Sequence, residues 1–414
     1  MANPILNLGN NEWATKSESL LGYSKSGSNF KPVPFTHSRA SVGTTTDRNG
    51  VVETISGDTP RIDFQDNEKG ALLLEPQRTN LSTYSEDFSN SAWTKGNLTV
   101  SSNTAVAPNG TLTADSITPN ATTTAIRLYQ AHTTSATDYS LSFFVKSNGR
   151  QYVQLLFGGV LSAVYSNFDL VNGTVTAGTS GAGKIEYYNN GWYRISLKAS
   201  LNAGTDQIYL WSIDSVSAAR GSTSTGNGTD GYYVWGSQFE QGTYESSYIP
   251  TEASSVTRLV DSSHLLNHSL FTDYPFTVYA KAEVKAIPND FFSLVDNTSS
   301  EKYLLFQLGG ATQISVHRRN SITNDSDYYY FSYSIGDTLK VAISYISATA
   351  YKLYINGTQI GNVTSGSSLP FAYPDIILGQ QRVTSDTGRR NPISEFMVFN
   401  EALSDSELQT LTTL

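Results

Sequence analysis

Short runs in which hydrophobic and polar residues alternate recur along most of the chain. Alternation with a period of two is the pattern of half-buried β-strands. Clear examples are SLSFFVK at residues 140–146, QYVQLLF at 151–157, QIYLWSI at 207–213 and YYVWGSQ at 232–238. Tight turns are marked by Asn49-Gly50, Asn172-Gly173 and Asn356-Gly357. Strands at this close spacing, without helical windows between them, predict an all-β protein built of two tandem antiparallel β-sandwiches of the jelly-roll type.

One segment near the C-terminus has a helical pattern instead. Residues 404–411 read SDSELQTL, and Ser404 and Glu407 have the spacing of a capping box. We therefore expect a single short helix at the end of the chain.

The chain divides into three parts on the same patterns. Residues 1–80 read as an irregular N-terminal anchor, with Pro32 and Pro34 and one apolar run at 71–74. Residues 81–255 and 256–414 are the two predicted sandwiches, separated where Pro250 precedes a polar stretch. Because the N-terminal part has too little apolar sequence for a core of its own, we expect it to become ordered against a partner.

Composition excludes several classes of protein. The 414 residues include no cysteine, so disulfides and thiolate-bound metals are not expected. The net charge is −9 with only 27 Lys and Arg, which argues against nucleic acid as a partner. The N-terminus, MANPILNLGN, lacks the features of a secretory signal, and no apolar run approaches the ~18 residues of a membrane span.

Several segments resemble those of bacteriophage and prophage structural proteins. The segments are FTHSRAS at 35–41, DRNG at 47–50, GALLLEPQRTNL at 70–81 and GYYVWGSQFEQGTYESSYIP at 231–250. In such proteins they surround a jelly roll similar to a carbohydrate-binding module. Further on, YKLYING at 351–357, IILG at 376–379 and ISEFMVFNEAL at 393–403 resemble a concanavalin A-like or laminin-G-like lectin domain.

The resemblance implies a virion surface protein: a fibre, a spike or a capsid decoration, on head or tail. Such a protein assembles in the host cytoplasm and is exposed on the particle. Its N-terminal part would dock on other virion proteins, its sandwiches would adhere to host or environmental glycans, and a homotrimer is the expected oligomer. The alternatives are a decoration protein that binds no sugar and a glycan depolymerase.

Motifs for catalysis are incomplete. Residues 178–184 read GTSGAGK, but Ile185 stands where a phosphate loop needs a hydroxyl residue. His264 and His268 have the spacing of a metal pair without a third ligand. The acidic triplet Glu-x-Asp-x-x-Glu of concanavalin-like glycosidases and the Gly-x-Ser-x-Gly elbow are both absent from the sequence. We therefore expect a protein that is not an enzyme.

Aromatic residues are the better candidates for function, because sugar rings stack on exposed aromatic faces. Trp192 and Trp235 are predicted to be core, whereas Trp211 and the consecutive tyrosines are predicted to be exposed. The tyrosines in the second sandwich would suit either a sugar or a subunit contact. The candidate glycan-binding residues are Trp211, Tyr187, Tyr188, Tyr232, Tyr329 and Tyr333.

No cofactor is expected. The oxygen-rich stretches Asp296-Asn297 and residues 324–327 (NDSD) would suit calcium, and the same stretches are typical of plain turns.

Overall fold

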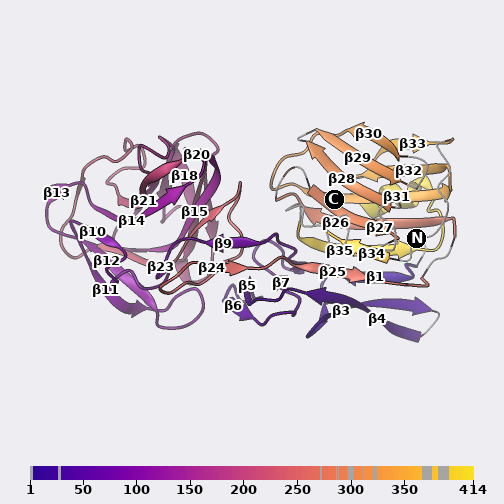
Figure 1. Cartoon of the computed structure of the whole chain (residues 1–414), viewed down its shortest axis with the longest axis horizontal. Helices are drawn as coiled ribbons and strands as arrows, with labels where there is room; N and C mark the ends of the chain where they lie inside the picture. Colours follow the sequence, from indigo (N-terminus) through magenta and orange to yellow (C-terminus); the bar gives the residue numbers. More distant parts are fainter. Residues whose placement is uncertain are drawn as a thin grey trace. The chain divides into compact units, whose positions relative to one another are not determined.

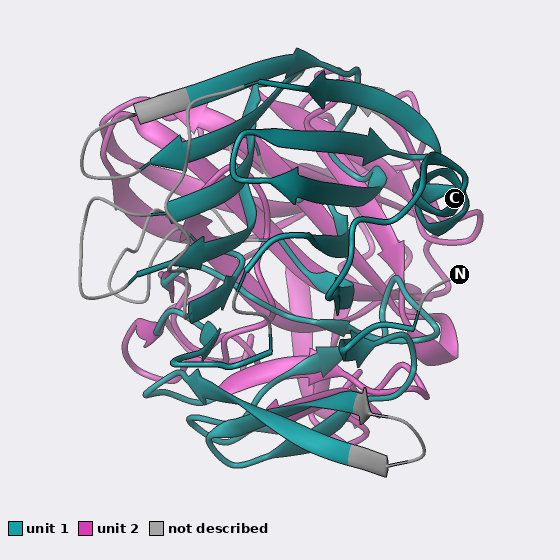
Figure 2. Cartoon of the chain, turned by 90° about the vertical axis from the view of Figure 1, so that its right-hand side faces the viewer, with its two compact units in different colours: residues 1–42, 55–77, 259–414 teal, residues 43–54, 78–258 magenta. Residues whose placement is uncertain are grey.

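The structure is a computed structural model that describes residues 3–26, 29–270, 273–285, 287, 289–296, 303–310, 312–319, 324–365, 375–380 and 391–414. Its regular structure consists of antiparallel strands, one short 3-10 turn and one α-helix, so the all-β prediction is confirmed. The chain forms two compact units (Figures 1 and 2). Unit 1 contains residues 1–42, 55–77 and 259–414, and unit 2 contains residues 43–54 and 78–258.

Unit 2 is a sandwich of two six-stranded sheets. The β14 sheet has the order β10 (Thr94–Gly96), β14 (Arg127–Thr134), β21 (Gly204–Ser212), β16 (Tyr152–Phe157), β17 (Tyr165–Asp169) and β18 (Thr174–Gly178). The β15 sheet has the order β11 (Leu98–Ala105), β12 (Ala114–Pro119), β23 (Gly231–Gln241), β15 (Thr137–Asn148), β20 (Tyr193–Leu201) and β19 (Gly183–Tyr187). The inward residues of both sheets form one core, for example Leu128, Leu210, Phe143 and Val234.

A second apolar cluster covers the outer face of the β15 sheet. Phe144, Trp192, Trp235 and Tyr248 are buried there with few exposed atoms, and the rings of Phe144 and Trp235 lie 5.3 Å apart. Val52, from β6 (Val52–Ile55), packs on the same cluster. The prediction that Trp192 and Trp235 are core residues is confirmed, although they lie outside the space between the two sheets.

Unit 1 is also a sandwich, and strands from both ends of the chain build it. One row of strands runs β30 (Asn324–Tyr330), β29 (Gln313–Arg319), β28 (Tyr303–Gly310), β27 (Asn289–Val295), β34 (Asp375–Leu378), β25 (Ser262–Leu265), β4 (Asn29–Ser38) and β3 (Ser19–Ser26). The other runs β33 (Thr358–Val363), β32 (Ala350–Ile355), β31 (Thr338–Ser347), β26 (Phe276–Glu283), β35 (Ile393–Phe399) and β1 (Leu6–Gly9).

The N-terminal strands are therefore part of unit 1, which differs from the separate segment 1–80 expected from the sequence. β1 pairs with β35 in the register Leu6–Val398, and it also pairs with β3. Leu6, Leu20 and Phe35 are completely buried in the core that the C-terminal strands share. The remaining elements of residues 1–80 are short: β2 (Ala14–Lys16), β5 (Gly43–Thr46), β7 (Ile62–Asp63), β8 (Ala71–Leu72) and β9 (Arg78–Asn80).

The predicted C-terminal helix is present as α1 (Asp405–Thr412). Ser404 accepts a hydrogen bond from the Glu407 amide, and the Glu407 side chain returns to the Ser404 amide, which completes the capping box. Leu408 packs on Tyr279 and Phe399. No helix in the described part of the chain is long and apolar enough to cross a membrane.

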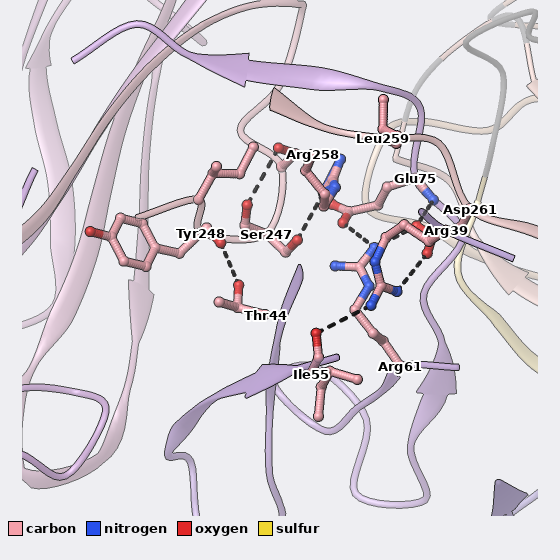
Figure 3. A network of polar contacts seen from close by, with 12 residues as sticks. Arg39, Thr44, Ile55, Arg61, Glu75, Ser247, Tyr248, Arg258, Leu259 and Asp261 are labelled. Carbon is pink, nitrogen blue, oxygen red and sulfur yellow. Dashed lines mark hydrogen bonds and ion pairs between the residues drawn. The ribbon is translucent and has the colours of Figure 1, made fainter. Parts of the chain in front are cut away.

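A buried cluster of charges holds three segments of unit 1 together (Figure 3). Asp261 accepts hydrogen bonds from Arg39 at 3.0 Å and from Arg61 at 2.5 Å, and Arg61 also pairs with Glu75 at 2.7 Å. Arg39 further donates to backbone carbonyls, among them that of Ser56 at 2.7 Å. Two guanidinium groups thus balance two carboxylates in a place where water is excluded, and removing any one of them leaves a buried charge unpaired.

Candidate functional site

The structure separates the six aromatic residues that the sequence analysis selected. Trp211, Tyr188, Tyr232 and Tyr333 are only 2–6 % exposed, Tyr187 is 59 % exposed and Tyr329 is half-buried. The prediction that Trp211 is exposed is therefore wrong, and the same correction applies to Tyr188, Tyr232 and Tyr333.

Each of these four side chains is buried for a local reason. The Trp211 indole donates to the carbonyl of Ser222 at 2.8 Å, beneath a loop that crosses the sheet. Tyr188 belongs to the cluster on the β15 sheet, and its ring lies 4.9 Å from that of Phe144. The hydroxyl of Tyr232 hydrogen-bonds to Ser212, and that of Tyr333 donates to the carbonyl of Gln313 at 3.1 Å. A ring held in this way has no free face for a sugar.

The two remaining candidates lie in different units. Tyr187 ends β19, an outer strand of the β15 sheet, and its ring meets Tyr193 edge-on at 5.5 Å. The hydroxyl of Tyr329 hydrogen-bonds to that of Tyr351 at 2.6 Å. The ring contact of Tyr187 and the hydroxyl contact of Tyr329 are thus with residues outside the six candidates.

A different group of side chains does come together, on the outer face of the β14 sheet. Arg127 and Tyr129 of β14 lie opposite Trp211 and Tyr209 of β21 in the antiparallel register. Their neighbours Leu128 and Leu210 point into the core, so strict alternation places these four side chains on the other side of the sheet. We call this group of Arg127, Tyr129, Tyr209 and Trp211 the β14–β21 face.

The rings of the β14–β21 face form a continuous surface around one guanidinium group. The Tyr129 and Tyr209 centroids lie 5.2 Å apart, and Tyr209 meets Trp211 at 5.6 Å. The Cζ of Arg127 lies 5.1 Å from the Trp211 ring, 5.5 Å from Tyr129 and 5.9 Å from Tyr209. Arg127, Tyr129 and Tyr209 are half-buried and keep part of their surface open to solvent.

A loop of residues 214–222 covers the other half of this sheet face. Gln154 of β16 accepts a hydrogen bond from the Gly221 amide at 2.8 Å and donates to Ala219. Asn167 of β17 donates to the carbonyls of Val216 and Ala218 at 2.9 and 2.8 Å. The accessible part of the sheet therefore lies over β14 and the adjoining half of β21.

Polar groups border the open part of the sheet face. Burial raises the pKa of Tyr209, and the charge of Asp206 raises it further, so the hydroxyl stays protonated at neutral pH and donates to Gln207 at 2.8 Å. The carboxylate oxygens of Asp206 accept backbone amides of Gln207 and Val160, at 2.9 and 3.1 Å. The face thus offers rings, a hydroxyl, an amide and a cation.

Comparison with known proteins concerns mainly the C-terminal part. Residues 259–409 match the concanavalin A-like lectin/glucanases superfamily. This agrees with the lectin-like sandwich expected there, and unit 1 contains it. No curated protein matches the chain.

Several solved structures are similar to parts of the chain. The sialidase carbohydrate-binding module CBM40 of Ruminococcus gnavus, bound to α2,3-sialyllactose, is 16 % identical, covering 34 % of this chain and 84 % of that one at a TM-score of 0.31. Domain 4 of the arabinanase AbnA from Geobacillus stearothermophilus is 16 % identical over 42 % of this chain and 83 % of that one, with a TM-score of 0.32. The NanB sialidase of Streptococcus pneumoniae is 19 % identical over 35 % of this chain and 25 % of that one, with a TM-score of 0.29.

The two oxygen-rich stretches expected to suit calcium lie in unit 1. Among the residues that the structure describes, no group of three His, Asp or Glu side chains could hold a metal ion. The carboxylate of Asp327 accepts hydrogen bonds from Arg318 at 2.7 Å and Tyr351 at 2.5 Å, so it is already neutralised. Asn297 and the side chains of residues 324 and 325, which were also considered for calcium, lie outside the described residues.

Sequence reasoning missed Arg127, Tyr129 and Tyr209. A signal for them exists in RLY at residues 127–129 and YLW at 209–211, where the first and third residues of each triplet share a strand face. The sequence does not reveal that these two strands, about eighty residues apart, are direct neighbours in the sheet.

Proposed function

We propose that the protein is a non-catalytic glycan-binding protein and that the β14–β21 face of unit 2 is its binding surface. The observation that carries the proposal is the pair of adjoining rings, Tyr129 and Tyr209, which lie partly open on the outer face of the β14 sheet beside hydrogen-bonding groups. Aromatic rings with one apolar face and a polar rim are suited to the C–H face and hydroxyl edge of a sugar. The lectin-like character of residues 259–409 supports the same class of function.

We further propose that this binding serves adhesion on a virion surface. The support is the resemblance of residues 35–41, 47–50, 70–81 and 231–250 to segments of phage structural proteins. In this proposal the N-terminal segment contacts other virion proteins, the particle carries the chain as a homotrimer, and the sandwiches face the host. Mass spectrometry of purified particles, followed by localisation of the chain in particle images, tests this part. Absence of the chain from the particles would overturn it.

The binding function is tested on a glycan array with the full chain. Replacing Tyr209 by Ala removes one ring of the face, and we expect binding to weaken by about tenfold or more, the effect of losing ~1.4 kcal/mol. Tyr187→Ala is the control, because Tyr187 is an exposed tyrosine of the same unit outside the β14–β21 face. Equal binding by both variants and the unchanged chain would refute the assignment of the face.

The array result also separates the alternatives. A decoration protein without a sugar ligand would bind no glycan on the array. A depolymerase would release reducing ends from host polysaccharide during incubation, whereas the proposed binding protein would leave the polysaccharide intact.

A further inference from the structure

We infer that the glycan bound at the β14–β21 face carries a carboxylate, and that Arg127 is the residue that selects it. This inference rests on the proposed glycan-binding function and specifies the chemical class of the ligand. It follows from three properties of Arg127: it has no anionic partner, its side chain is held in one position, and it stands beside the rings that would hold the sugar.

Arg127 differs from the comparable arginines in its lack of a partner. Its Nε is buried without a hydrogen-bond acceptor, and no carboxylate in the described part of the chain pairs with its guanidinium. Arg150 of the same unit pairs with Asp214 at 2.6 Å, and the buried Arg318 of unit 1 pairs with Asp327 at 2.7 Å. A half-buried cation without an acceptor has lost part of its hydration, so an arriving anion gains more there than at a fully solvated arginine.

The side chain of Arg127 is fixed from two sides. The three rings hold the guanidinium by cation–π contacts at 5.1–5.9 Å. On the neighbouring strand β10, Gly96 lies opposite Arg127, and a Cβ at that position would come within 3.0 Å of the Arg127 Cγ and 3.4 Å of its Nε. The absence of a side chain at residue 96 therefore leaves the space that the arginine occupies. A guanidinium that is already positioned loses little conformational entropy when it binds.

The position of Arg127 relative to the rings matches an acidic sugar. The guanidinium lies over the Tyr129 and Tyr209 rings, 5.5 and 5.9 Å from their centroids, so a sugar that contacts the open parts of these rings comes next to it. A carboxylate accepts two parallel N–H bonds from an arginine, and we assign a carboxylate to this position. A sulfate ester can accept the same pair of bonds and is a competing outcome of the test. The carboxyl group of Asp206, which influences Tyr209, already accepts two backbone amides.

The test compares three ligand classes on the full chain: neutral, carboxylated and sulfated glycans on one array. We expect carboxylated glycans to bind most tightly, and conversion of the best one to its methyl ester should weaken binding about tenfold or more. Arg127→Gln should lower affinity for the acid to that for the ester. Arg127→Lys should recover only part of the preference, because lysine lacks the bidentate geometry.

Gly96→Ala provides a second variant that keeps the charge. Its Cβ displaces Arg127, so we expect the preference for the acid over the ester to fall while binding of the ester is unchanged. Thermal melting of each variant shows that the fold is retained.

The possible failures are distinguishable. Equal binding of acid and ester that is lost in Tyr209→Ala would overturn the inference about Arg127 and leave the glycan-binding function standing. Preference for sulfated glycans would overturn the carboxylate assignment. An array on which no class binds would overturn both proposals together.

Discussion

Replacing Asp261 by Asn tests whether the buried charge cluster stabilises unit 1. The substitution keeps the shape of the side chain but removes one of the two negative charges that balance Arg39 and Arg61. Asp261 also accepts the Glu75 amide at 3.0 Å, an interaction that an Asn oxygen can retain. Because both carboxylate oxygens of Asp261 accept hydrogen bonds, the Asn amide also turns one acceptor into a donor that faces an arginine, while most of the packing is unchanged.

The expected loss is large because neither arginine can become neutral. Although burial lowers the pKa of Arg61, Asp261 and Glu75 together raise it above its ordinary value. The variant would bury one uncompensated positive charge, and breaking a buried pair in this way costs about 3–5 kcal/mol of unfolding free energy. The matched control is Asp405→Asn, which breaks the 2.6 Å pair with Lys352 at a carboxylate that is 58 % exposed. An exposed pair of that kind contributes about 0–1 kcal/mol.

The two units can be followed separately during unfolding in urea. Four of the five tryptophans (Trp93, Trp192, Trp211 and Trp235) lie in unit 2, so tryptophan fluorescence reports mainly on that unit. Hydrogen exchange of peptides from β4 and β25 reports on unit 1. We expect Asp261→Asn to lower protection in unit 1 and leave the fluorescence transition unchanged.

A compensating variant completes this test. Arg39→Met combined with Asp261→Asn restores neutrality, so the pair should cost less than the sum of the two single changes. If Asp261→Asn costs no more than Asp405→Asn, or the double variant is simply additive, the charge-balance argument is refuted.

Three further changes test other parts of the structure. Burial lowers the pKa of His37 to about 4. The unfolded chain therefore takes up the proton at a higher pH than the folded chain, and about 3 kcal/mol of unit 1 stability should be lost as the pH falls from about 6.5 to 4. In the His37→Gln variant, the stability of unit 1 measured by hydrogen exchange should depend less on pH over this range. Trp211→Ala should remove about 3–5 kcal/mol from unit 2 in a fluorescence-monitored urea titration, and a loss under 1 kcal/mol would show that Trp211 is not core. Ser404→Ala should cost about 1 kcal/mol, seen as faster exchange confined to α1.

Much of the fold was readable from local pattern, and the exceptions are long-range pairings. Alternation identified the strands over 140–146, 151–157, 207–213 and 232–238, and all four lie within strands of the structure or overlap them closely. The placement of β1 was not readable, because its partner β35 lies nearly four hundred residues along the chain. Its own sequence, LNLG, is too short to reveal that the missing neighbour is at the other end of the protein.

The candidate site was predicted only in part, because it too depends on contacts between residues far apart in the sequence. Alternation correctly places Trp211 on the outer face of its strand, and it is the loop over that face that buries it. A loop that folds back on a sheet leaves no periodic signal in the sequence. The neighbouring Tyr209 keeps part of its surface open to solvent, which only the structure reveals.

The segments at residues 35–41, 47–50, 70–81 and 231–250 and the residues proposed to bind a ligand occupy different places in the structure. Arg39 of FTHSRAS and Glu75 of GALLLEPQRTNL belong to the buried charge cluster, and Asn80 of the latter segment donates to the carbonyls of Ser237 and Ile249 at 2.9 and 2.8 Å. These are polar side chains whose partners lie far away in the sequence, so the fold constrains each of them tightly. The open residues Arg127, Tyr129 and Tyr209 of the β14–β21 face lie outside these segments. Similarity of two chains in these segments therefore indicates that they share a fold. The ligand depends on other residues, which can differ between two chains of the same fold.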